Sequence, residues 1–193
     1  MTTVDDKKYK VIGTTPIRHD GADKVTGRAI YGIDYHMTGM LWGKILRSPH
    51  AHARIRSIDA SKALALPGVY AVVTGKDMAV ATDLEVEAGE TSLNYMHLSD
   101  NVMAREKALY KGHAVAAVAA DTQHIAEEAL GLIDVDYEVL EPVLNGREGM
   151  KPDAPLIHPN QTTKIMAFRF DPGTDSGEKS NVAGKSQLKH GDI

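Results

Sequence analysis

Alternating apolar and polar residues in the segment 40–59, MLWGKILRSPHAHARIRSID, predict two β-strands. We expect the strands over residues 40–46 and 51–58. The corner between them contains Pro49, which has no backbone N–H to donate to a strand ladder. This segment is the most distinctive stretch of the chain, and the rest of the prediction is organised around it.

The second of these strands separates its residues between two faces, because side chains in a strand alternate with a period of two. Ala51, Ala53 and Ile55 fall on one face, which indicates contact with a core. The other face is basic, and together with the corner it supplies a candidate interface with another domain or chain. Its residues are Arg47, Ser48, His50, His52, Arg54 and Arg56.

Further along the chain, the pattern predicts two helices and three more strands. Asp59 is expected to cap a short helix that ends at Pro67, and a strand follows over residues 69–73. The run AVAAVAA at 114–120 has small apolar residues on both faces, which predicts a strand covered on both sides. Asp121 is expected to cap an amphipathic helix over 122–131, followed by a strand over 133–139. The acidic face of that last strand consists of Asp134, Asp136 and Glu138.

The remaining segments show weaker patterns. Residues 1–27 indicate an extended N-terminal arm, 28–34 a weak strand, and 76–106 a long excursion without a sustained period. Residues 146–193 are rich in proline and glycine and are expected to form an extended linker. The predicted organisation is therefore an arm (1–27), an α+β domain with a mixed sheet and two helices (28–145), and a linker (146–193).

Composition narrows the classes of function. The chain has 193 residues, 42% of them hydrophobic, a formal charge of −4 and no cysteine. Thiolate metal sites, protein-ligated iron–sulfur clusters and cysteine nucleophiles are thereby excluded within these residues. We find no signal peptide and no apolar run of membrane-spanning length, and the charge does not favour nucleic acid. The expected location is the cytoplasm, with neither membrane nor nucleic acid as a partner.

Two readings stay open for the basic face. His50 and His52 are spaced to reach one metal ion, with Asp34 or Asp59 completing a hydrolytic site, whereas the structural alternative is a polar strand face packed on another domain. The arginines suit a phosphate or anionic cofactor, but pairing with the acidic strand at 134–138 is the favoured alternative, because both sets of charges belong to strands that could meet in a sheet. No dinucleotide, P-loop, GxSxG or HExxH motif is present.

Three blocks of the sequence resemble one known family. They are DGADKVTGRAIYGID with GMLWGKILRSPHAHARIRSIDASKALALPGVYAVVTGKD, then ALYKGHAVAAVAADTQHIAEEALGLIDVDYEVLEPV, and finally SNVAGKSQLKHGDI. They resemble the start of the molybdopterin-binding large subunit of the xanthine dehydrogenase, aldehyde oxidase and carbon monoxide dehydrogenase family, nearest to the bacterial xanthine dehydrogenase or hydroxybenzoyl-CoA reductase type. Two departures are Ala114, where the family often has proline, and the loop LNGREGM after the acidic strand.

The resemblance implies the family's α/β hammerhead domain, whose catalytic base and pterin contacts lie in later domains. It therefore assigns no catalytic, cofactor-binding or metal-binding residue to this chain. The implied parent is a molybdenum-dependent oxidoreductase that hydroxylates an aldehyde or N-heterocycle, or reduces an aromatic thioester. Its implied partners are the remaining molybdopterin-binding domains and the iron–sulfur (2Fe-2S) and flavin (FAD) subunits. The alternatives are a free-standing protein-binding module that docks through the basic face and, from another class, a small metallohydrolase built on His50 and His52.

Overall fold

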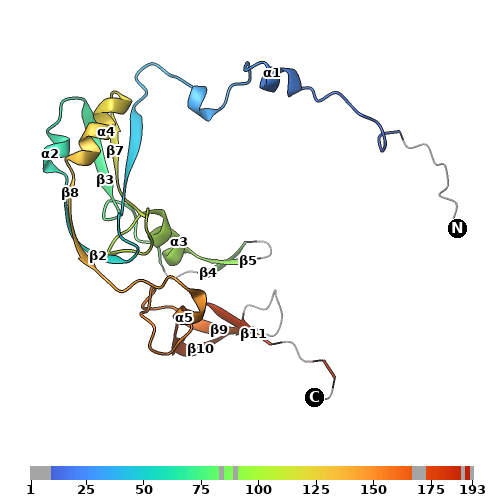
Figure 1. Cartoon of the computed structure of the whole chain (residues 1–193), viewed down its shortest axis with the longest axis vertical. Coiled ribbons are helices and arrows are strands. Elements are labelled where there is room, and N and C mark those ends of the chain that lie inside the picture. Colours follow the sequence, from blue (N-terminus) through green and yellow to red (C-terminus); the bar gives the residue numbers. More distant parts are fainter. Residues whose placement is uncertain (1–9, 83–84, 89–90, 167–172, 188–189, 192–193) are drawn as a thin grey trace. The chain divides into compact units, whose positions relative to one another are not determined.

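The computed structural model describes residues 10–82, 85–88, 91–166, 173–187 and 190–191 (Figure 1). The chain divides into two compact units, residues 1–40 and residues 41–193. We describe each unit separately.

The first unit contains two short helical elements, α1 (Gly21–Val25) and the 3-10 turn η1 (Gly32–Asp34). The strand predicted over 28–34 is wrong, because the Tyr31 N–H donates to Oδ2 of Asp34 (3.0 Å) and closes a turn around Gly32. Large apolar side chains from Val11 to Met40 are exposed in this unit. Residues 1–9 of the predicted arm lie outside the described part.

The second unit is built on two three-stranded antiparallel sheets. The first has the order β1 (Trp42–Arg47), β7 (Ala114–Ala120), β3 (Val69–Thr74), and the second has the order β6 (Lys107–Ala108), β2 (Ala53–Asp59), β8 (Asp134–Val139). The two strands predicted from the segment 40–59 both exist, but they belong to different sheets. The chain crosses from one sheet to the other at the corner after Arg47.

Helices α2 (Ser61–Leu64) and α4 (Gln123–Gly131) cover one face of the first sheet. Ala63 and Ala129 bring the helices onto Ala116 and Val118 of the central strand, and the apolar stripe predicted for α4 faces this core. A smaller cluster of Ile55, Ala104 and Val115 joins the two sheets.

The helix caps differ in part from prediction. At α2 the N-cap position is Ala60 and not Asp59, although the Asp59 carboxylate, one residue earlier, accepts a hydrogen bond from Ser61 N (2.9 Å). At α4 the cap is Thr122, whose hydroxyl accepts from Ile125 N (3.2 Å), and not Asp121. The Asp121 carboxylate instead accepts a hydrogen bond from the Tyr70 hydroxyl, which raises the pKa of that tyrosine.

The segment 76–106 is more ordered than its sequence suggests. It contains a hairpin of β4 (Glu85–Ala88) and β5 (Thr91–Asn94), followed by helix α3 (Tyr95–Val102). The Asn94 side chain caps α3 by accepting from Met96 N and His97 N. Met103 and Ala104 are then buried, so the end of this excursion belongs to the core.

The segment 146–193 also departs from the expected extended structure. Its described residues form α5 (Gly146–Gly149) and a small sheet in the order β10 (Thr174–Lys179), β9 (Thr162–Met166), β11 (Gly184–Ser186). Asn181 ties this part together, because its amide donates to the carbonyls of Gly149 and Pro155 and accepts from Ile157 N. Among the described residues, no helix has the length and apolarity needed to span a membrane.

Candidate functional site

The basic residues of β2 face the acidic residues of β8. Arg54 lies opposite Glu138 in the antiparallel register, with 3.4 Å between Nε and Oε2, and Arg56 Nε lies 3.6 Å from the same oxygen. Asp134 takes a different partner, the Lys62 ammonium at 2.7 Å. The two arginines of β2 therefore form ion pairs with the acidic strand β8, as one of the two interpretations of the basic face proposed. Both arginine side chains remain more than half exposed.

The corner before β2 is buried in its middle, contrary to the prediction that it contributes to an open polar face. Ser48 is only 2% exposed, its N–H donates to the carbonyl of His113, and its own carbonyl accepts from Gly112 N. Arg47 is exposed, and its guanidinium donates to the carbonyl of Gly112 (2.8 Å). These bonds fix the corner against the turn that precedes β7.

The two histidines of this stretch do not lie on the arginine face. The β2 strand begins only at Ala53, and His52 is 4% exposed, with Nδ1 2.7 Å from the carbonyl of Glu141. The His50 ring meets Tyr137 edge-on at 5.1 Å. Within the described part of the chain, no three His, Asp or Glu side chains gather as metal ligands. The described residues therefore provide no ligand set for the metallohydrolase alternative. Of the residues predicted for the basic face, Arg47, Arg54 and Arg56 are the exposed ones.

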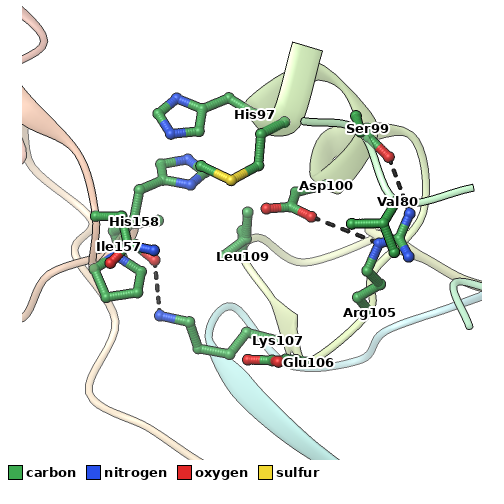
Figure 2. Close-up of a pocket in the computed structure, with 14 residues that line it drawn as sticks. Val80, His97, Ser99, Asp100, Arg105, Glu106, Lys107, Leu109, Ile157 and His158 are labelled. Carbon is green, nitrogen blue, oxygen red and sulfur yellow. Dashed lines mark hydrogen bonds and ion pairs between the residues drawn. The ribbon is translucent and has the colours of Figure 1, made fainter. Parts of the chain in front are cut away.

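A cavity of about 250 Å³ lies elsewhere in the second unit (Figure 2). It is lined by residues of α3, by the segment 105–109 around β6, and by the loop 157–160. Figure 2 shows the His97 and His158 rings lying face to face, and their centroids are 4.6 Å apart with 20° between the planes. The nitrogen lone pairs of an imidazole lie in the plane of its ring. The lone pairs of two stacked rings therefore do not converge on one point, and the pair is poorly placed to bind one metal ion together.

The cations of this cavity are already engaged by the protein. Lys107 Nζ donates to the carbonyl of Ile157 (2.7 Å), and Arg105 donates to the carbonyl of Ala79 (2.6 Å) and to Ser99 Oγ (3.2 Å). Burial lowers the pKa of Lys107 and also the pKa of His158, which the adjacent His97 lowers further. The arrangement stabilises the packing of the loop 157–160 and leaves no unengaged cation for an anionic ligand among these residues.

Sequence reasoning did not find this cavity. Most of its walls come from the excursion 76–106 and from the predicted linker, two segments without hydrophobic period, and Lys107 and Leu109 complete them. The one available signal was Asn94, a strong helix-capping residue placed just before YMHL.

Comparison with known proteins identifies the family. The sequence profile of the "aldehyde oxidase and xanthine dehydrogenase, a/b hammerhead domain" matches residues 26–141. This chain belongs to that family.

Individual relatives agree with this assignment. The carbon monoxide dehydrogenase large chain of Afipia carboxidovorans is 40% identical over 172 residues, which are 81% of this chain and 20% of the relative. The nicotinate dehydrogenase large molybdopterin subunit of Eubacterium barkeri is 34% identical over 79% of this chain and 34% of its own length. The solved structure of quinoline 2-oxidoreductase from Pseudomonas putida 86 superposes with a TM-score of 0.64 and 36% identity, over 76% of this chain and 19% of that one. The chain thus spans between about a fifth and a third of these relatives.

Proposed function

We propose that this chain is the N-terminal hammerhead portion of a molybdenum hydroxylase large subunit, and that it acts in assembly without supplying a catalytic group. The observation that carries the proposal is the family match across residues 26–141, which includes every strand of both large sheets. The names of the relatives support it, since one is a large molybdopterin subunit and another a large chain. A molybdenum cofactor would supply the redox chemistry of the parent enzyme.

The residues that the structure describes do not fit a molybdopterin group. A pterin phosphate needs free cations or backbone donors, whereas Lys107 and Arg105 in the cavity donate to protein carbonyls. His52 is buried, with Nδ1 2.7 Å from the Glu141 carbonyl and Nε2 enclosed by protein without a hydrogen-bond partner. The His97 ring stacks on His158. We therefore place the cofactor on the remaining domains of the subunit and derive no chemical step from this chain.

The proposed partners are those remaining domains, together with iron–sulfur and flavin subunits that exchange electrons with them. Because these 193 residues contain no cysteine, they supply no thiolate ligand for an iron–sulfur cluster. This composition also agrees with a cytoplasmic setting, where disulfides are rare. The alternative of a free-standing module that docks through its basic face has less support, because Glu138 already neutralises part of that face.

A domain exchange tests the proposal. The hammerhead segment of the Pseudomonas putida quinoline 2-oxidoreductase large subunit is replaced by residues 26–141 of this chain, and the chimera is produced with its native partner subunits. The expected result is an assembled enzyme that retains molybdenum and oxidises quinoline. A chimera that folds but assembles no molybdenum enzyme, beside an active enzyme carrying the Afipia hammerhead in the same position, would overturn the proposal.

A further inference from the structure

The sheet β1–β7–β3 has one covered face and one open face. The covered face carries Leu46, Val72 and Val118, which pack with the alanines of α2 and α4. The register of the strands defines two rows on the opposite face. These rows are Gly43–Ala119–Ala71 and Ile45–Ala117–Val73.

This second face is apolar and accessible. Ile45 is 45% exposed and Val73 is 36% exposed, while the alanines of the two rows are partly buried. Neither row contains a polar or charged side chain. An antiparallel sheet that faces water on one side normally presents polar residues there, so these rows have the composition of a covered face.

The other sheet of the same unit provides an internal comparison. The outward residues of its paired strands β2 and β8 include Arg54, Arg56 and Glu138, which is the expected composition of a solvated face. The two sheets therefore differ in composition at these positions, although Val139 at the end of β8 is also exposed.

The shape of the open face suits a helix. In the row Ile45–Ala117–Val73 the larger side chains stand on the two edge strands and the small one on the central strand. The second row is formed by glycine and two alanines, which permit a close approach of another backbone. Small side chains therefore lie along β7 between the larger Ile45 and Val73 of the edge strands, and we name the surface formed by these two rows the trough.

We infer that this trough docks an apolar helix from the part of the large subunit that lies outside these 193 residues. The inference rests on the proposed function. The rest of the subunit is long enough to supply this helix, because this chain corresponds to only 20% of the carbon monoxide dehydrogenase large chain. The contact would complete the two-sided cover that the sequence of β7 predicts.

Gly43→Arg is the variant that tests the trough. A Cβ at Gly43 would meet only the Val118 carbonyl oxygen, at 4.0 Å, so an added side chain extends into open space. Glu128→Arg places the same cation on the exposed outer side of α4 and is the matched control. Both variants are made in the isolated chain and in the quinoline oxidoreductase chimera.

The main readout is carbene footprinting of β1 and β3. In the assembled chimera we expect labelling of Ile45 and Val73 to fall several-fold relative to the isolated chain. We expect Gly43→Arg to abolish assembly and Glu128→Arg to preserve it, while both isolated variants keep the thermal midpoint of the unmodified chain. Equal labelling of Ile45 and Val73 in the isolated chain and in the chimera, or full assembly with Gly43→Arg, would overturn the inference. If the unmodified chimera is active in that case, the proposed function still holds. An isolated chain that forms a dimer which Gly43→Arg dissociates would also overturn it, because a second copy would then be the occupant.

Discussion

Arg54 lies opposite Glu138 across the β2–β8 pair, and Arg56 approaches the same carboxylate, so two cations share one exposed anion. The three side chains are between 40% and 57% exposed, and solvent screens ion pairs in such positions. Ile55, between the two arginines, is only 9% exposed and packs on Ala104 and Val115. The stabilising contribution of β2 therefore comes from its apolar side.

Replacing both arginines with alanine should change the free energy of unfolding by no more than about 0.5 kcal/mol, because exposed charges contribute little. Ile55→Ala should cost about 2–5 kcal/mol through lost burial and the cavity left behind. Urea denaturation of the isolated chain measures both. A double arginine variant as unstable as Ile55→Ala would mean that the charge cluster holds the two strands together.

Gly75 marks a close approach between the end of β3 and the segment that follows α3. A Cβ at this position would clash with the carbonyl oxygen of Ala104 and lie 3.0 Å from Cα of Arg105. Gly75→Ala should therefore destabilise the chain by about 1–3 kcal/mol, as overpacking does. The control is Gly43→Ala, where the space is open and the midpoint should not fall. Equal midpoints for the two variants in thermal unfolding would show that Ala104 moves aside without cost.

The stability of the chain should fall as the pH drops below neutrality. His113 is fully buried and stacks on Tyr110, and burial lowers its pKa from the ordinary value of 6.5. Burial and the adjacent His97 also lower the pKa of His158. Because the unfolded chain binds these protons first, the contribution is present above pH 6.5 and is lost as the pH falls through the lower folded-state values.

The measurement is the free energy of unfolding between about pH 7 and pH 5, a window in which ordinary carboxylates remain ionised. Asp59 and Asp77, whose pKa values are lowered from 3.8 by backbone hydrogen bonds, lose their contribution only in more acidic solution. His113→Gln should flatten the slope in this window. His124→Gln, which removes an exposed histidine of α4, is the control. Equal slopes for the unmodified chain and His113→Gln would contradict the assignment.

Local patterns predicted much of the fold. The period of two in β2 and β8 placed Ala53 and Ile55 inside, and the stripe of α4 placed Ala126 and Ala129 against the sheet. The charge pattern indicated that the basic strand could pair with the acidic strand, and β2 does pair with β8. The local patterns did not predict that β1 pairs with residues 114–120 in a different sheet. Such non-local pairing depends on burial of the assembled sheets, which a local period does not record.

The candidate interface was predicted only in part for a related reason. His52 alternates correctly with Arg54 in sequence, yet β2 begins after it, and the Glu141 carbonyl holds its ring inside. His113 follows Gly112 and resembles a turn residue in sequence, but the Leu109 N–H donates to its Nδ1 and Tyr110 covers its ring. For His52 a contact with a residue far along the chain accompanies burial, whereas for His113 the contacts come from the neighbouring residues of its own turn.

The central claim is that this chain shapes a molybdenum enzyme without holding the metal. The most direct test is the molybdenum content per polypeptide, measured by mass spectrometry after native purification from a molybdenum-replete host. We predict no stoichiometric molybdenum in the isolated chain and about one atom per large subunit in the quinoline oxidoreductase chimera, where the other domains supply the cofactor site. Stoichiometric molybdenum in the isolated chain would contradict the account.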